Sequence, residues 1–304
     1  MSSEVEDERV WSTVMVEEQG EPRRADEAPK ADAPRAGASP RRPRAMTIAG
    51  SDSGGGAGIQ ADLKTFAAFG VYGTSAITAV TAQNTVGVRA IHEIPPEIVA
   101  AQIDAVLDDI GADAVKTGML SSASIIEAVA DRLRAHSVAA LVVDPVMVAK
   151  SGDALLRPEA VRALIELLLP IAAVVTPNAP EATVLSGIEV RNGESAREAA
   201  RRIHDLGPAL VIVKGGHLDG EQSDDLVFDG RSFEVLSGKR IDTPHTHGTG
   251  CTFSAAIAAG LALRLEPRVA AREARAFLQG AIEHAEPLGA GHGPVNHFWR
   301  TSDV

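Results

Sequence analysis

Residues 247–259 of this 304-residue chain read HGTGCTFSAAIAA, which places small residues where a helix must begin. A helix start leaves backbone N–H groups unpaired and carries a partial positive charge, so it attracts anions. Gly248 and Gly250 let a phosphate approach that backbone without a Cβ in the way. Cys251, the single cysteine of the chain, lies in the same turn, where we expect a lowered pKa and a thiol able to act as base or nucleophile. The alternative is a cysteine that is simply buried at a tight helix entry.

The composition is acidic, with a net charge of −12, 45% hydrophobic residues and 3% aromatic residues. Nucleic-acid and membrane-surface binding both favour basic patches, and no apolar run reaches the roughly 18 residues that a membrane span requires. One cysteine excludes an internal disulfide and is typical of a reducing compartment. The first residues, MSSEVEDERVW, lack the apolar segment of a secretory signal. We therefore expect a cytoplasmic protein that binds neither nucleic acid nor membrane.

Residues 1–44 differ in composition and in hydrophobic pattern from the remainder of the chain. They mix charges of both signs with five prolines and show no sustained apolar period. Such a segment cannot bury enough apolar surface to offset its ordering entropy, so we predict a disordered tail. Residues 45–304 have a length that suits one large α/β domain.

Short apolar runs alternate with helical patterns from residue 45 onward. Six runs are predicted to be strands, at 46–49, 75–81, 114–116, 140–143, 173–176 and 209–213. Most of them are apolar on both faces, as parallel strands covered by helices on each side should be. Amphipathic or capped patterns predict helices at 99–110, 122–135, 158–169, 195–206, 249–264 and 267–286.

A different pattern interrupts this alternation late in the chain. Residues 225–228 and 232–236 flank Asp229-Gly230, a strong hairpin signal. Alternating strands and helices otherwise indicate βαβ units. The fold prediction is therefore a three-layer α/β domain with a central, mostly parallel sheet, helices on both faces and a small late β-hairpin.

The segment after the first strand, residues 50–62, is rich in glycine. In parallel sheets ligands bind beyond the carboxyl ends of the strands, so this loop is a candidate site. Its Gly56-x-Gly58-x-x-Ala61 spacing is similar to a dinucleotide loop, but the acid expected roughly 20 residues later is missing. Asp62 lies one turn into the next helix, where it either points back at a ligand or is a solvated acid favoured by the helix dipole.

Polar residues follow several other strands. Gln83 carries amide donors and a carbonyl acceptor suited to an aminopyrimidine or pyridine edge, unless it is an ordinary loop residue. Asp144 is either a turn acid or a group that meets Mg²⁺ through water. Asn178 and Glu181 have the spacing of a capping box, and binding of Mg²⁺ and phosphate is the sharper alternative. Lys214 precedes two glycines and suits the role of a positive point charge that contacts a phosphate.

Several familiar motifs are missing from the sequence. No G-x-x-x-x-G-K-[ST] stretch is present, which excludes a P-loop nucleotide fold, and Ser53 lacks the nucleophile-elbow spacing. His245, His247 and Cys251 have a spacing that does not favour a zinc site in the absence of further cysteines.

Four stretches together resemble one known family: residues 48–64, 82–85, 246–252 and 293–298. The sequence is similar to the bacterial hydroxymethylpyrimidine/phosphomethylpyrimidine kinases of thiamine biosynthesis, which have a ribokinase-like fold. The match runs in order through residues 45–300, and Ser53-Gly54 departs from the Pro-Ser often found in that loop. The tail lies outside the resemblance.

The resemblance implies ATP-dependent phosphorylation of 4-amino-5-hydroxymethyl-2-methylpyrimidine and then of its monophosphate, with Mg²⁺ and in a homodimer. The implied pyrimidine pocket consists of Gly50, Asp62, Gln83, Met119 and Val146. The implied anion hole and ATP site consist of Gly248, Thr249, Gly250, Cys251, Asn178, Glu181 and Lys214, with Asp144 and Glu181 near Mg²⁺. Cys251 stands where sugar kinases of the wider fold have an aspartate base, so we expect it to be the base of the first step and a bystander in the second.

Two alternative functions stay open at this point. Pyridoxal kinase is an enzymatic alternative, because its ring substrate is alike and some of its members share a Gly-Thr-Gly-Cys motif. The ending Gly293-Pro294-Val295-Asn296-His297 favours the pyrimidine. A non-catalytic pyrimidine sensor that retained the pocket is the other alternative.

Overall fold

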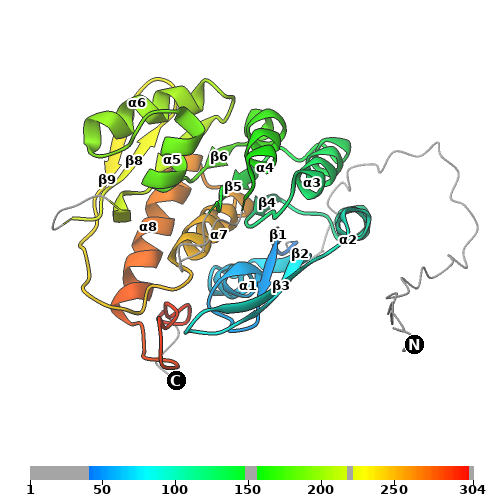
Figure 1. Cartoon of the computed structure of the whole chain (residues 1–304), viewed down its shortest axis with the longest axis horizontal. Helices are drawn as coiled ribbons and strands as arrows, with labels where there is room; N and C mark the ends of the chain where they lie inside the picture. Colours follow the sequence, from blue (N-terminus) through cyan, green and yellow to red (C-terminus); the bar gives the residue numbers. More distant parts are fainter. Residues whose placement is uncertain (1–40, 148–155, 218–221, 301–304) are drawn as a thin grey trace, which may run out of the picture. The chain divides into compact units, whose positions relative to one another are not determined.

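The computed structural model describes residues 41–147, 156–217 and 222–300 (Figure 1). The described residues from Arg42 onward belong to one compact unit. The predicted disordered tail lies outside the described residues up to position 40. Its predicted end at residue 44 falls just inside the first strand, which begins at Arg44.

A single sheet of nine strands is formed by the described residues, in the order β3-β2-β1-β4-β5-β6-β7-β8-β9 (Figure 1). The parallel strands are β1 (Arg44–Asp52), β2 (Tyr72–Gln83), β4 (Ala114–Thr117), β5 (Leu141–Val143), β6 (Val174–Val175) and β7 (Leu210–Val213). The antiparallel strands are β3 (Val88–Glu93), β8 (Asp225–Phe228) and β9 (Phe233–Leu236). The predicted mostly parallel sheet and the late hairpin are thus confirmed.

Eight α-helices occur in the described residues. They are α1 (Gly58–Ala68), α2 (Pro96–Asp109), α3 (Ala123–Ala135), α4 (Pro158–Ala163), α5 (Ala179–Ser186), α6 (Gly193–His204), α7 (Thr249–Ala262) and α8 (Pro267–Glu283). Six of these eight helices overlap predicted ranges, whereas α1 and α5 had no predicted range. The helix predicted over 158–169 is regular only in its first half and continues as a π turn over Leu164–Leu168. Pro170 lacks an N–H group and crowds the carbonyl of residue 166, which disturbs the regular α-helical ladder there.

Strand residues point alternately into two hydrophobic cores. In β5, Leu141 and Val143 join the core that contains residues of α2 to α6, whereas Val142 joins the core that contains α1, α7 and α8. Side chains of successive strand residues point to opposite faces, so apolar residues in succession require a helical layer on each side. The predicted three-layer architecture is confirmed.

The strand order reverses at β1, which pairs with β2 on one side and with β4 on the other. Crevices that bind ligands form at such a switch point, beyond the carboxyl ends of the strands. The glycine-rich loop after β1 lies there, and α7 packs on both α1 and β4. Helix α7 is buried from Thr252 to Ala262, because its small apolar side chains surround the whole helix. A rigid element therefore starts at the switch point.

The edge strand β3 has no counterpart among the predicted strands. Its residues, VRAIHE, are almost all exposed and mix charged with apolar types, so they lack the pattern of a half-buried strand. The available signal is the turn before it, where the Asn84 side chain accepts hydrogen bonds from the N–H groups of Val86 and Gly87, at 3.0 and 3.3 Å. Asparagine and glycine, which stand at positions 84 and 87, are residue types typical of turns.

None of the helices in the described ranges is long and apolar enough to cross a bilayer.

Replacing Ile257 by alanine should destabilise the fold by about 2–5 kcal/mol, because its side chain is fully buried in α7. Urea denaturation followed by circular dichroism measures the change in unfolding free energy. Leu263, which follows α7 and is 38% exposed, provides the matched control. A loss in Ile257→Ala no larger than that in Leu263→Ala would show that α7 is not the rigid element inferred above.

Candidate active site

A cavity of about 1730 Å³ extends along the carboxyl ends of the parallel strands. Every predicted site residue except Asp62 lines it. These residues are Gly50, Gln83, Met119, Asp144, Val146, Asn178, Glu181, Lys214, Gly248, Thr249, Gly250 and Cys251. Residues far apart in the sequence thus meet in one space, as the switch-point geometry predicts.

The start of α7 opens into this cavity. Gly248 precedes the helix with a left-handed φ of 81°, and no side chain caps the first turn. A Cβ at Gly248 would lie 1.8 Å from the carbonyl oxygen of Gly56, so only glycine fits. The first-turn amides and the positive end of the helix dipole suit an anionic group.

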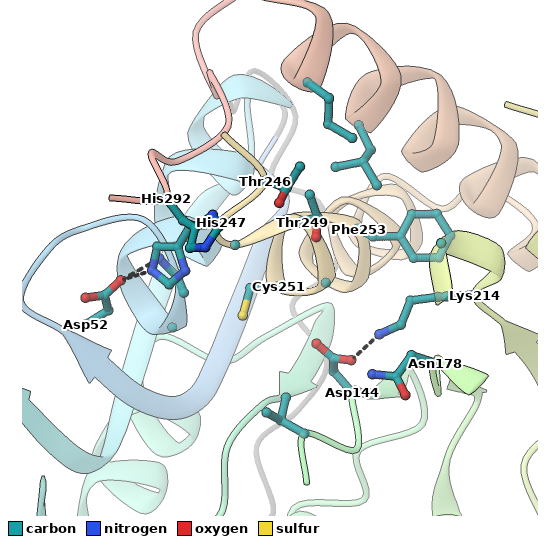
Figure 2. A pocket seen from close by; sticks show the side chains of 18 of the residues that line it. Asp52, Asp144, Asn178, Lys214, Thr246, His247, Thr249, Cys251, Phe253 and His292 are labelled. Atoms are coloured by element: carbon teal, nitrogen blue, oxygen red, sulfur yellow. Dashed lines mark hydrogen bonds and ion pairs between the residues drawn. The ribbon is translucent and has the colours of Figure 1, made fainter. Parts of the chain in front are cut away.

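Cys251 lies between two groups of polar side chains, the Asp52–His247 pair and the Asp144–Lys214 pair (Figure 2). Its sulfur accepts a hydrogen bond from the backbone N–H of Gly58, the first residue of α1. Burial raises the pKa of the thiol to about 11, against the opposing effect of Lys116. The expected lowering of this pKa is therefore wrong, because loss of hydration outweighs the helix start.

Lys214, Asp144 and Glu181 form a charged cluster on the other side of the cavity. Lys214 Nζ lies 2.9 Å from Asp144 Oδ1 and 3.9 Å from Glu181 Oε2. Burial alone would raise the pKa of Asp144, but the ammonium groups of Lys214 and Lys116 hold it below its usual value. Burial raises the pKa of Glu181 to about 7, because Lys214 compensates it only partly.

Asn178 and Glu181 also form the predicted capping box at the start of α5. The Asn178 side chain accepts from Glu181 N at 2.9 Å, and Glu181 Oε2 accepts from Asn178 N at 2.7 Å. The capping box is thus confirmed, and both side chains also face the cavity. One oxygen of Glu181 is engaged by the backbone, so it is fixed in place for a second role.

These residues fit a hydrated divalent cation. Mg²⁺ is usually held by one or two carboxylates together with water and phosphate oxygens, and not by an all-protein cage. Asp144 and Glu181 supply two carboxylates near one lysine. No cluster of three or more metal-ligating side chains occurs in the described part of the chain.

The pyrimidine-side residues lie at the ends of β1, β2 and β4. A Cβ at Gly50 would lie 2.5 Å from Cε of Met119, so the glycine leaves room for the methionine in the cavity wall. Gln83 ends β2 and lies 3.4 Å from His247, measured between the two Nε2 atoms. Its oxygen accepts from Thr81 Oγ1 at 3.3 Å, which leaves amide hydrogens for a ring edge.

Asp52 and His247 were not predicted as site residues, although His247 was considered and disfavoured as a zinc ligand. The Asp52 carboxylate accepts hydrogen bonds from the backbone N–H groups of Gly54, Gly56 and Ala57, at 2.8–3.1 Å. Its Oδ2 atom also lies 2.8 Å from His247 Nε2. Although burial opposes it, these hydrogen bonds lower the pKa of Asp52, so the carboxylate accepts and His247 donates. The available signal was an aspartate just before a glycine run, which is typical of a side-chain-capped turn.

The structure corrects the prediction for Asp62. Its carboxylate is fully buried and contacts Lys116 Nζ at 2.8 Å and Thr47 Oγ1 at 2.6 Å. It is neither a solvated first-turn acid nor a lining residue of the cavity, whereas its partner Lys116 does line the cavity. Lys116 was missed, although a lysine at the end of the short predicted strand 114–116 is an available signal.

The phosphomethylpyrimidine kinase family model matches residues 52–296. The hydroxymethylpyrimidine/phosphomethylpyrimidine kinase of Rhizobium meliloti is 56% identical over 260 residues, which are 84% of this chain and 97% of the relative. The thiamine biosynthesis bifunctional protein ThiED of Geobacter sulfurreducens is 54% identical over 259 residues. This chain covers only 53% of its length.

Two solved structures share the fold. The pyridoxal kinase of Bacillus subtilis in an ADP complex has a TM-score of 0.81 and 43% identity, covering 86% of this chain and 100% of its own. A phosphomethylpyrimidine kinase from Clostridium difficile has a TM-score of 0.71 and 46% identity, and the match covers 79% of this chain and 99% of the neighbour's chain. These likenesses confirm the ribokinase-like fold. Since the family model and the curated relatives both span most of the sequence, the chain belongs to the phosphomethylpyrimidine kinase family.

Proposed function

We propose that this chain transfers the γ-phosphoryl group of ATP to 4-amino-5-hydroxymethyl-2-methylpyrimidine and then to the resulting monophosphate, in thiamine biosynthesis. One observation carries the proposal. A single cavity brings together Gln83, the start of α7 and the cluster of Lys214, Asp144 and Glu181. Relatives about half identical to this chain are named for both phosphorylation steps.

Phosphoryl transfer depends on positioning and charge stabilisation more than on covalent chemistry. In this proposal the amides of Gly248, Gly250 and Cys251 hold the transferring group, and Lys214 and Thr249 contact ATP phosphates. Asn178 orients Glu181 through the capping box. Asp144 and Glu181 are the residues that hold Mg²⁺, which supplies charge neutralisation at phosphate oxygens when bound.

The proposed pyrimidine pocket contains Gln83, Gly50, Met119 and Val146. An amide offers a donor and an acceptor side by side, which complements the amino group and ring nitrogen of an aminopyrimidine. His247 donates to Asp52 and therefore does not need the Gln83 amide as a partner. Asp62 does not contact the pyrimidine in this proposal, because it pairs with Lys116 and does not line the cavity.

Pyridoxal phosphorylation is a second candidate, and one observation favours it. Pyridoxal kinases superpose with a TM-score of 0.81, against 0.71 for the phosphomethylpyrimidine kinase. Sequence identity ranks them in the opposite order, at 43% and 46%. We give more weight to the sequence identity than to the TM-score, because the TM-score averages over the whole superposed backbone, including segments remote from the cavity. The pyrimidine therefore remains the first candidate substrate. A non-catalytic sensor has no need for the cluster of Lys214, Asp144 and Glu181.

We also propose that the chain forms a homodimer in the cytoplasm, where a reducing environment suits its single cysteine. The edge strand β3 and its turn expose two apolar side chains, Ile91 at 46% and Val86 at 73%, and an edge strand has backbone groups able to pair with another chain. Sedimentation velocity should give twice the mass of the chain. A monomer across the micromolar range would remove this part of the proposal.

A two-substrate kinase assay tests the main proposal. With ATP and Mg²⁺, the pyrimidine alcohol should be converted to monophosphate and then diphosphate, with kcat/KM above that for pyridoxal. The difference arises because the Gln83 amide matches the aminopyrimidine edge. Mass spectrometry identifies the products. A preference for pyridoxal would favour the second candidate, and ATP-dependent product from neither substrate would favour the sensor.

Replacing Cys251 by alanine should affect the two steps unequally. Alcohol phosphorylation should slow by about 10²-fold, the lower end of general-base effects, because the resting thiol holds its proton. Phosphorylation of the monophosphate should change far less, because its attacking oxygen is already anionic. Separate kcat measurements on each purified substrate check this. Equal losses in both steps would assign Cys251 to the anion hole alone.

A further inference from the structure

Lys116 and Asp62 form an ion pair in which both side chains are fully buried, with Nζ 2.8 Å from Oδ2. A buried pair of this kind is weak evidence for stability, because the loss of hydration offsets the attraction between the charges. Well-packed apolar side chains can often replace such a pair without loss of stability. The position of the pair next to the cavity therefore calls for a functional explanation.

The pair is connected to Cys251 through helix α1. The backbone N–H of Gly58 donates to the Cys251 sulfur, and Asp62 lies one helical turn further along the same face of α1. Lys116 comes from β4 and lines the cavity together with Cys251. Helix α7, which carries the cysteine, packs on both α1 and β4. Three elements thus converge on one sulfur atom.

Four charged groups act on the Cys251 sulfur. They are Lys116 of β4, Asp62 of α1, Asp144 after β5 and Lys214 after β7. Lys116 favours the thiolate most strongly, whereas the carboxylates of Asp62 and Asp144 disfavour it. Because Lys116 and Asp62 are shielded from solvent, water and salt screen their effect only weakly.

We propose that Lys116, held by Asp62, is a positioning residue that stabilises the thiolate of Cys251 during phosphorylation of the pyrimidine alcohol. In that step the hydroxymethyl oxygen bonds to the γ-phosphorus, the bond to the leaving ADP oxygen breaks, and the hydroxyl proton moves to the thiolate sulfur. Lys116 remains an ammonium group throughout. The monophosphate attacks through an oxygen that has no proton to lose, so the pair contributes only to the first step. This catalytic consequence rests on the proposed kinase function, but the electrostatic effect on the thiol does not.

Alkylation of the thiol tests the electrostatic effect directly. Cys251 is the single cysteine of the chain, so iodoacetamide labelling of the full-length protein reports on this sulfur alone. Only the thiolate reacts, and the rate at each pH follows its population. The main variant is Lys116→Met combined with Asp62→Asn, because removing one partner alone leaves a buried, unpaired charge. The expected result is alkylation about threefold slower at pH 9, because Lys116 favours the thiolate more strongly than Asp62 disfavours it, so the loss of both charges still raises the thiol pKa.

The direction of this change separates an electrostatic role from a structural one. Loosened packing would expose the sulfur and speed up alkylation, whereas loss of the Lys116 charge slows it. Lys64→Gln is the matched control, since Lys64 also lies on α1 but donates to Gly55 O at 2.7 Å on the glycine loop. Its alkylation profile should equal that of the wild type. Thermal unfolding verifies that each variant is folded, and Lys116→Gln alone, in which the remaining Asp62 can take up a proton, should shift in the same direction.

A kinetic measurement then addresses the catalytic consequence. In the double variant kcat for the alcohol should fall about threefold more than kcat for the monophosphate, matching the loss of thiolate. Unchanged or faster alkylation in the folded variants would overturn the inference, whatever the activity. Slower alkylation with equal losses in both steps would limit the pair to tuning the thiol and overturn its part in the first step. Failure of the wild-type enzyme to phosphorylate the pyrimidine would instead count against the proposed function.

Discussion

The contact between Gly248 and the carbonyl oxygen of Gly56 is the constraint on which the site depends. The loop after β1 and the loop before α7 meet so closely that a Cβ at Gly248 would lie 1.8 Å from that oxygen. This contact fixes the first turn of α7 over the carboxyl end of β1, at the point where the strand order reverses. The Asp52–His247 pair ties the same two loops together from the side, at 2.8 Å.

The C-terminal segment braces this junction from outside. His247 N donates to Gly293 O at 3.1 Å, and Val295 N donates to His247 O at 3.3 Å. His297 lies 2.9 Å from the hydroxyl of Thr252, the residue after Cys251, and burial lowers the pKa of this histidine to about 4. A neutral imidazole therefore contacts the first turn of α7 and adds no positive charge there. The motif that pointed to the family at the sequence level thus has a physical task, which is to hold the start of α7.

The sequence predicted the features that follow from periodicity and from strand ends. Apolar runs located the parallel strands. The rule that ligands bind beyond the carboxyl ends of such strands then selected Gln83, Asp144 and Lys214, which line one cavity in the structure. The sequence did not predict properties that arise from burial in the folded protein. The direction of the Cys251 pKa shift reverses because lost hydration exceeds the local effect of the helix start. Asp62 is withdrawn from the cavity because Lys116, distant in sequence, pairs with it, and no local pattern reports such a partner.

The high pKa of Cys251 suits an enzyme that accepts two chemically different substrates in one site. A carboxylate base at this position would repel an anionic phosphate monoester. A thiol with a pKa of about 11 is neutral at physiological pH and opposes neither the alcohol nor the monophosphate. A neutral thiol provides only a small thiolate population for the alcohol step. The buried ammonium group of Lys116, which favours the thiolate, increases that population without adding a second base. The charges that surround Cys251 therefore balance the needs of a proton-losing first step against those of an anionic second one.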